Sequence, residues 1–390
     1  MAKKRFAILT GGGDVPGLNL AIKNFVLGAE EEGAEVVGIR RGWGGLLWYD
    51  LDDPETQRKY TMALDRKIVR RVDRTGGTFL HTSRTNPQSV RPKDIPEFLA
   101  KSSLGKQVKE DGSMDYTDHV MKVLDHLKID SLVTIGGDDT LSYSARLSKD
   151  GFPLVAIPKT MDNDVNGTEY CIGFSTAITG AVSLLTNFRT SVGSHERIGV
   201  VELFGRNSGE TSLVTGYLSY ADRTVICEVP YNPQKLTELL VKDKHDNPSH
   251  YAIVVISEGA MTDDGTVIES GEADAYGHKK LGGIGELLAD QIKLFSGYNT
   301  MFQRLAYLVR SGAPDMVDRM VAMNFGTLAW QLTSRGEFGK MVAINNGRYN
   351  AVALSNVSHT SRRVDVDKFY DVDQYRPRIK NIVGMPMFLE

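Results

Sequence analysis

The chain has 390 residues, of which 41% are hydrophobic and 24% charged, a composition typical of a soluble globular protein large enough for two domains. Its formal charge of -3, from 46 basic and 49 acidic residues, argues against a broad cationic surface for nucleic acid or membranes. Cys171 and Cys227 lack the number and spacing of a disulfide framework or metal site, so we expect two inert thiols. No stretch is apolar enough for a signal peptide or membrane span, which predicts a cytoplasmic protein.

Short apolar runs alternate with longer amphipathic segments, a rhythm typical of βαβ units. The predicted strands are 6–10, 36–40, 131–135, 154–157, 198–203, 224–229 and 251–257. The predicted helices are 16–32, 116–127, 172–190 and 283–295. This order predicts an α/β protein with a parallel sheet covered by helices on both faces. The polar stretches 101–115 and 243–249 are expected to be surface excursions.

Three polar segments directly follow predicted strands: Gly-Gly-Gly-Asp-Val-Pro-Gly-Leu-Asn at 11–19, Gly-Gly-Asp-Asp-Thr at 136–140, and Pro-Lys-Thr-Met-Asp-Asn-Asp at 158–164. Because ligands of such sheets bind at the carboxyl ends of strands, we expect the three segments to form one site. Asp138 and Asp164 are candidate Mg²⁺ ligands, and Asp162 is a candidate base for a sugar hydroxyl. The glycines allow a phosphate to approach the main chain.

Each segment also has a simpler interpretation. The glycine triplet fits a strand-to-helix turn with Pro16 near the first helical turn. Asp139 beside Thr140 fits a helix N-cap, and the Asp-Asn-Asp run fits an Asx turn. Arg84, in Gly-Gly-Thr-Phe-Leu-His-Thr-Ser-Arg at 76–84, taken alone fits a surface arginine.

Together these segments resemble those of the phosphofructokinase family, and the similarity covers most of residues 5–355. The resemblance implies two Rossmann-like three-layer α/β/α domains. The phosphoryl-donor domain comprises residues 1–172 and 311–355, and the sugar-phosphate domain comprises 173–310 and 356–390. It also implies Mg²⁺ as cofactor, pyrophosphate and fructose 6-phosphate as substrates, and a homodimer or homotetramer with shared active sites.

The resemblance assigns roles residue by residue. Asp162, Arg84 and Lys159 are catalytic, Asp138 binds metal, and Gly12, Gly13, Asp139 and Lys159 bind the donor. The acceptor residues are Thr160, Asp162, Asp164, Arg197, Phe204, Gly205, Arg206, Glu258, Tyr307 and Arg310, with Arg197 reaching across a subunit boundary. A fixed arginine suits the charge spread over phosphoryl oxygens.

The donor is predicted from Asp139, because ATP-using family members carry glycine there. A carboxylate would fill the space of the nucleotide's α-phosphate and repel it, whereas Lys159 can hold pyrophosphate. The sequence therefore predicts reversible transfer from pyrophosphate to the C1 hydroxyl of fructose 6-phosphate. The alternatives are an ATP-dependent 6-phosphofructokinase or related sugar-phosphate kinase, and a catalytically silent regulatory subunit.

Two positions depart from the family pattern. Tyr307 stands where ATP-using enzymes usually have histidine, and Met301 stands where a second cross-subunit arginine is expected. Arg304 is a candidate replacement for that arginine. These departures leave sedoheptulose 7-phosphate as a second possible acceptor.

Overall fold

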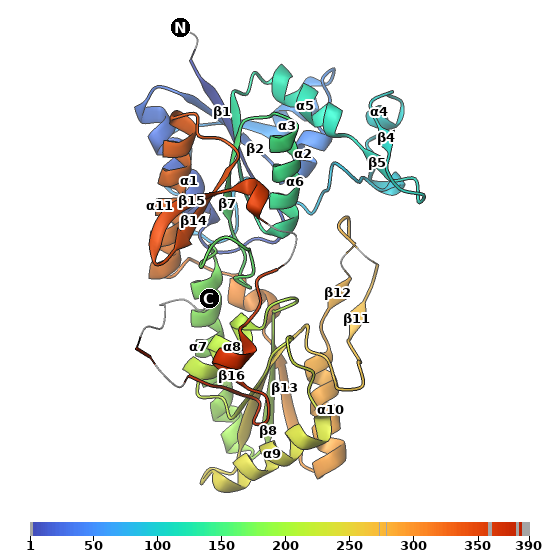
Figure 1. Cartoon of the computed structure of the whole chain (residues 1–390), viewed down its shortest axis with the longest axis vertical. Coiled ribbons are helices and arrows are strands. Elements are labelled where there is room, and N and C mark those ends of the chain that lie inside the picture. The colour runs from blue at the N-terminus through green and yellow to red at the C-terminus, as the bar shows by residue number, and fades with distance from the viewer. Residues whose placement is uncertain (1–2, 273, 278, 358–360, 380–381, 384–390) are drawn as a thin grey trace.

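The computed structural model describes the whole chain except residues 1–2, 273, 278, 358–360, 380–381 and 384–390. It has two lobes, each built around its own sheet (Figure 1). Within the described residues, no helix is both long and apolar enough to cross a membrane.

The first sheet has seven strands in the order β15 (Arg348–Ala353), β14 (Lys340–Asn345), β7 (Leu154–Pro158), β6 (Ser131–Gly136), β1 (Arg5–Thr10), β2 (Glu35–Ile39) and β3 (Thr61–Leu64). Its five central strands are parallel, but β3 and β15 pair antiparallel at the two edges. The prediction of a parallel sheet is therefore wrong at both edges. These strands have mixed, partly exposed side chains, so neither gives the apolar run of a buried strand.

Helices cover both faces of this sheet, as predicted. Phe6 and Ile8 of β1 pack toward α1 (Leu18–Glu31) and α11 (Met316–Ser334). Ala7 and Leu9 face the opposite layer. That layer contains α2 (Gly42–Leu47), α5 (Thr117–His126) and α6 (Asp138–Lys149). Burial on both faces explains why the central strands are continuously apolar.

The second sheet is fully parallel, in the order β13 (Thr300–Arg304), β8 (Ile198–Leu203), β10 (Ala252–Ser257) and β9 (Arg223–Val225). Its helices are α7 (Phe174–Ser194), α8 (Glu210–Leu218), α9 (Pro233–Asp246) and α10 (Ile284–Ser296). One core cluster extends from α1 and α11 through α7 to β8 and β10. The two lobes therefore share a hydrophobic core.

Shorter elements decorate the lobes. They are α3 (Pro54–Tyr60), η1 (Ile68–Arg70), η2 (Val72–Arg74), η3 (Pro92–Asp94), α4 (Glu97–Ala100), β4 (Lys106–Gln107), β5 (Met114–Asp115), β11 (Glu269–Ser270), β12 (Lys280–Leu281), η4 (Ala306–Arg310), η5 (Leu354–Asn356), α12 (Val366–Phe369), β16 (Tyr370–Asp371) and β17 (Arg376–Pro377).

Three local predictions need correction. Helix α1 begins at Leu18 after an N-cap at Gly17, so Pro16 precedes its first turn. The strand expected at 224–229 ends at Val225. The excursion expected at 243–249 begins inside α9, because Asp243 forms a largely buried ion pair with Arg223 at 2.5 Å and extends the helix to Asp246. The predicted domain boundaries at 172, 310 and 355 stay a prediction.

Candidate active site

The site lies where the carboxyl ends of β1, β6 and β7 meet the second lobe. Arg310 of η4 reaches across to the glycine loop, where its Nη1 lies 2.7 Å from the position that a Cβ on Gly13 would occupy. In the other direction, the charges of Glu258 and Arg206 act on Asp162 of the first lobe. Both lobes therefore contribute to the predicted centre.

The glycine loop after β1 permits a close approach by Lys159. Gly12 has φ +77°, and a Cβ there would lie 3.1 Å from the Lys159 Nζ atom. The Gly12 N–H donates to the Ser83 carbonyl at 2.9 Å, while Thr82 Oγ1 donates to the Gly12 carbonyl at 2.7 Å. Gly12 thus provides space and a fixed backbone, and its amide is already engaged within the protein.

Helix α6 begins directly at the acidic pair. Gly137 is its N-cap residue, and Asp138 and Asp139 occupy its first turn. The alternative prediction that Asp139 is the N-cap is therefore wrong, because Gly137 takes that position. Acidic side chains in the first turn are favoured by the helix dipole.

Only one of the two carboxylate oxygens of Asp138 has a hydrogen-bond partner among the described residues. Its Oδ2 accepts a hydrogen bond from Ser361 Oγ at 3.1 Å, whereas its Oδ1 is buried without a hydrogen-bond partner among the described residues. Burial and the charge of Asp164 raise the pKa of Asp138 to about 7. A cation between these two carboxylates would relieve their repulsion, so the residues fit Mg²⁺.

Protein side chains alone do not complete such a site. Across the residues that the structure describes, no three His, Cys, Asp or Glu side chains gather closely enough to hold a metal ion. Mg²⁺ usually keeps only one or two protein carboxylates and takes substrate phosphate oxygens as further ligands. Asp138 with Asp164 matches that pattern.

Lys159 is a buried cation in this centre. Lys159 directly follows β7 in the chain, and its side chain is buried. Burial and the charges of Arg310 and Arg84 lower the pKa of its amine to about 8. Asp139 and Asp14 act in the opposite direction, so both lie near enough to influence the amine. The ammonium form still predominates at neutral pH and suits a phosphate oxygen.

Asp162 lies two residues before the buried Asp164 and is itself half-buried. Its Oδ1 is buried and has no hydrogen-bond partner within the described part of the chain. Burial, Asp164 and Glu258 raise the pKa of Asp162 well above its ordinary value. A raised pKa suits a carboxylate that accepts a proton during catalysis, because its basicity is closer to neutral pH. Its neighbour Thr160 accepts the Asp162 N–H at 3.1 Å and orders the turn.

The second lobe supplies a group of aromatic and charged side chains. The Arg310 guanidinium lies over the Tyr307 ring at 4.3 Å and the Phe204 ring at 5.2 Å. Gly205 adopts φ +134°, and a Cβ there would lie 2.8 Å from the Ser208 carbonyl oxygen. Burial raises the pKa of Glu258 to about 7. The charges of Glu258 and Arg310 act on Asp162, so this group lies near Asp162 from the side of the second lobe.

Two predicted site residues, Arg84 and Arg197, are less closely associated with this centre. Arg84 pairs with Asp274 at 3.5 Å, and 55% of its side chain is exposed, although its charge acts on Lys159. Arg197 directly precedes β8, at the amino end of a sheet whose carboxyl end faces the site. A six-residue strand spans about 20 Å, so Arg197 is remote from the site of its own chain.

Met301, which stands where an arginine is expected, and its candidate replacement Arg304 make different contacts. Met301 packs against the main core cluster. Arg304 forms an ion pair with the buried Glu202, its Nε lying 2.6 Å from Oε1. Arg304 is therefore tied to β8 within its own chain.

Sequence reasoning missed the contribution of the C-terminal part of the chain. Ser361 contacts Asp138 across 223 positions, and Arg362 pairs with Glu210 across 152. No periodicity or motif marks either residue. Only the fold brings them to the centre.

The sequence matches a known protein family over most of its length. A family model described as Phosphofructokinase matches residues 5–333. A pyrophosphate–fructose 6-phosphate 1-phosphotransferase of Dictyoglomus thermophilum is 34% identical over 95% of this chain and 98% of its own length. The corresponding enzyme of Thermoproteus tenax is 36% identical over 92% and 95%. An ATP-dependent 6-phosphofructokinase of Corynebacterium efficiens is 33% identical over 95% and 98%.

Solved structures show the same fold. A pyrophosphate-dependent phosphofructokinase from Nitrosospira multiformis has a TM-score of 0.75 at 18% identity, covering 97% of this chain and 89% of its own. The Pichia pastoris phosphofructokinase in the T-state has a TM-score of 0.73 at 22% identity, covering 92% and 35%. The predicted α/β phosphofructokinase fold is confirmed. The chain belongs to the phosphofructokinase family and is an enzyme, a transferase, of that family.

Proposed function

We propose that this phosphofructokinase catalyses reversible, Mg²⁺-dependent phosphoryl transfer from pyrophosphate to the C1 hydroxyl of fructose 6-phosphate. The products are fructose 1,6-bisphosphate and phosphate. The observation that carries the proposal is the acidic first turn of α6, Asp138 and Asp139, beside the buried amine of Lys159. The names of several relatives support the same reaction.

Asp139 is the residue on which donor choice depends. Its charge acts on both Asp138 and Lys159, so its carboxylate belongs to the donor end of the site. A nucleotide would bring its α-phosphate against this carboxylate in a partly desolvated environment, where like charges repel strongly. Pyrophosphate has no such third phosphate, so it can bind without this repulsion, and the charge of Asp139 still acts on Lys159.

The chemistry divides among the remaining residues. Mg²⁺, held by Asp138 with Asp164 and donor oxygens, would neutralise phosphate charge. Asp162 accepts the C1 hydroxyl proton as that oxygen bonds to the terminal phosphorus and the bridging P–O bond breaks. Lys159, Arg84 and Arg310 stabilise the charge that moves to the leaving phosphate. Reversibility is chemically reasonable, because a phosphoanhydride without a nucleotide is exchanged for a phosphate ester.

The acceptor is held mainly by the second lobe in this proposal. Glu258 accepts hydrogen bonds from sugar hydroxyls, and Arg206 and Arg310 approach the phosphoryl region. Phe204, Gly205 and Tyr307 shape the pocket wall. Arg197 of a second subunit binds the 6-phosphate, which requires at least a dimer. We place the enzyme in the cytoplasm.

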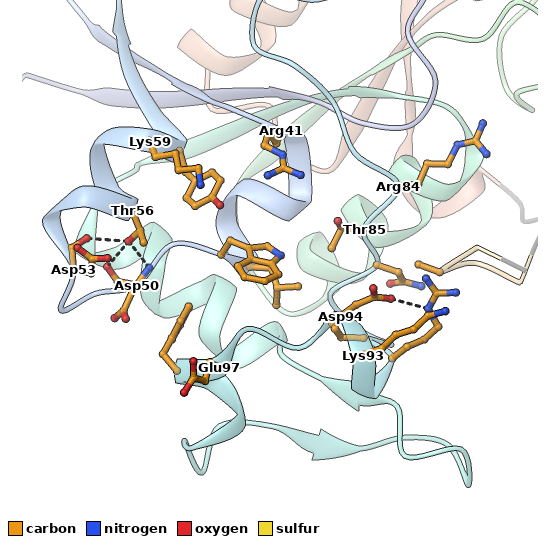
Figure 2. Close-up of a pocket in the computed structure, with 18 of the residues that line it drawn as sticks. Arg41, Asp50, Asp53, Thr56, Lys59, Arg84, Thr85, Lys93, Asp94 and Glu97 are labelled. Carbon is orange, nitrogen blue, oxygen red and sulfur yellow. Dashed lines mark hydrogen bonds and ion pairs between the residues drawn. The ribbon is translucent and has the colours of Figure 1, made fainter. Parts of the chain in front are cut away.

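ATP is the second candidate donor. An ATP-dependent relative is 33% identical over 95% of the chain, and a cavity of about 950 Å³ opens beside Arg84 and Thr85. Figure 2 shows Arg41 and Lys59 on one side of this cavity and Arg84 on the other. Its volume is large enough for a nucleoside, and Trp48 and Phe98 are among the residues that line it. Sedoheptulose 7-phosphate remains the second candidate acceptor.

The test is formation of fructose 1,6-bisphosphate with pyrophosphate and ATP assayed side by side. The wild type should use pyrophosphate, and Asp139→Gly should lose about tenfold in kcat/KM for pyrophosphate and gain measurable ATP use. Asp139→Asn is the matched control, since it removes the charge and keeps the size. Unchanged pyrophosphate kinetics in Asp139→Gly would contradict the donor argument. Silence of the wild type with both donors would favour a regulatory subunit.

A further inference from the structure

Residues 361–364, which follow β15 and η5 in the chain, contact both lobes. The N–H of Arg362 donates to the Asp164 carbonyl at 2.7 Å. Two residues further, the N–H of Val364 donates to Glu228 Oε1 at 3.0 Å. Glu228 also accepts the Gly209 N–H ahead of α8. This segment is therefore fixed to both lobes beside the catalytic turn.

The Arg362 side chain makes a buried set of contacts. Its guanidinium pairs with Glu210, and only 15% of the Arg362 side chain and 4% of the Glu210 side chain are exposed. The same guanidinium donates to the carbonyls of Thr168 at 3.3 Å and Glu169 at 3.1 Å. The guanidinium makes these contacts from two nitrogen atoms held in one plane, an arrangement that the single nitrogen of an ammonium does not reproduce.

Glu210 links this arginine to the turn between the catalytic carboxylates. Its Oε1 accepts a hydrogen bond from Asn163 Nδ2 at 3.1 Å. Asn163 is fully buried, has φ +53°, and lies between Asp162 and Asp164. Its Nδ2 also donates to the Glu169 carbonyl at 3.0 Å, and its Oδ1 accepts the Cys171 N–H at 2.8 Å. A left-handed asparagine persists only where its surroundings hold it.

A second contact of the same segment reaches the other carboxylate. Ser361 Oγ donates to Asp138 Oδ2 at 3.1 Å and accepts from Asn207 Nδ2 at 3.2 Å. The segment thus contacts the turn that carries Asp162 and Asp164 and, independently, the first turn of α6. Both carboxylate-bearing elements take part of their orientation from residues 361–362.

We propose that Arg362 is a positioning residue of the active site, which holds the Asp162–Asp164 turn in its catalytic geometry through Glu210 and Asn163. The inference rests on the proposed function for the roles of the two carboxylates. It assigns to the C-terminal segment a part in catalysis without direct contact with the reacting atoms. Removing the guanidinium leaves Glu210 buried without its cation, so the turn loses one of its fixed anchors.

The test compares Arg362→Ala with Arg363→Ala. The neighbouring Arg363 is exposed and donates to the Asn207 carbonyl at 3.2 Å, so it is a control of the same residue type on the same segment. With pyrophosphate as donor, Arg362→Ala should lower kcat about tenfold or more and change the KM for fructose 6-phosphate less than threefold. Arg363→Ala should retain the wild-type kcat. Added ethylguanidine should restore part of the rate of Arg362→Ala only.

Hydrogen exchange gives a readout that does not depend on turnover. In Arg362→Ala the amides of residues 162–171 should exchange faster, while those of β10 stay as in the wild type. If Arg362→Ala does not fold, Arg362→Lys keeps a cation beside Glu210 but cannot serve both carbonyls, and its kcat should still fall. A wild-type kcat in the folded Arg362→Ala or Arg362→Lys protein would overturn the inference. A fall in kcat that is fully explained by a smaller fraction of folded protein would also overturn the inference.

Failure of the proposed function is a separate outcome. If the wild type turns over neither donor, the reaction is wrong, and hydrogen exchange at residues 162–171 alone decides whether Arg362 holds the turn. Unchanged exchange there in folded Arg362→Ala would then reject the positioning role.

Discussion

Asp162 has a buried carboxylate oxygen that no described protein group satisfies, which is rare for a purely structural carboxylate. Its Oδ1 lacks a partner among the described residues, and its pKa is raised by burial and by Asp164 and Glu258. A buried acceptor without a hydrogen bond is costly unless a ligand satisfies it. The C1 hydroxyl of the acceptor is the group that the proposed reaction brings to this oxygen.

Replacing this carboxylate should slow the chemical step. We expect Asp162→Ser to lower kcat by roughly 10²-fold with the KM for fructose 6-phosphate within a few-fold, because a base acts mainly in the transition state. In the wild type, kcat should fall as pH drops, since protonation of a carboxyl with a raised pKa removes the base. Steady-state kinetics from pH 5.5 to 9 should show this fall. In Asp162→Ser the part of the fall that is due to Asp162 should be missing, which leaves the titration of Asp138 and Glu258.

Asp222 offers a matched control for that prediction. It is another aspartate whose pKa is raised by burial, and its Oδ2 accepts the Ile253 N–H at 2.7 Å near the amino end of β10. Asp222→Asn keeps an acceptor there and lies away from the site. We therefore expect an unchanged pH profile for Asp222→Asn. A near-wild-type rate for Asp162→Ser would remove Asp162 from the mechanism.

At the level of elements, the loop between β1 and α1 is shaped by the absence of a side chain at Gly12. A Cβ there would lie 3.1 Å from Lys159 Nζ, and the residue has φ +77°. We expect Gly12→Ala to raise the KM for pyrophosphate about tenfold, because a displaced ammonium no longer meets the donor oxygens. Initial-rate measurements with varied pyrophosphate test this.

The chain contains a control with nearly the same backbone. Gly33 has φ +76°, and a Cβ there would meet nothing within 4 Å. Both alanine variants should lose about 1 kcal/mol of unfolding free energy through the left-handed conformation. Only Gly12→Ala should lose donor affinity. Equal KM values in the two variants would show that Gly12 serves the fold and not the donor site.

The burial of each strand decides how well the sequence could predict it. Central strands such as β6 and β8 are buried on both faces, so their apolar runs identify them almost to the residue. Edge strands β3, β13 and β15 carry mixed side chains and are not among the predicted strands. The inner strand β14 is also missing from the prediction, although its four middle residues are buried. The sequence could predict that the carboxylates of the motifs share one site, because the carboxyl ends of parallel strands lie at one edge of the sheet. The contacts of Arg362 and Ser361 depend on tertiary folding and follow no local pattern.

For the whole molecule, the position of Arg197 determines the expected assembly. Each site faces the carboxyl ends of its strands, while Arg197 stands at the amino end of β8. An arginine so placed can bind the sugar 6-phosphate only in a neighbouring subunit. We therefore expect Arg197→Ala to raise the KM for fructose 6-phosphate at least tenfold, since a charge-assisted phosphate contact is lost.

Mixing two defective variants separates a shared site from a self-contained one. In a hybrid dimer of Arg197→Ala and Asp162→Ser, one of the two sites combines an intact Asp162 with an intact Arg197 from the other subunit. Random reassociation makes half of the dimers hybrid, so about a quarter of the wild-type activity should return at low fructose 6-phosphate. The assay is turnover after co-refolding, with each variant refolded alone as the reference. If Arg197 serves its own subunit, the hybrid contains no intact site, and co-refolding restores nothing.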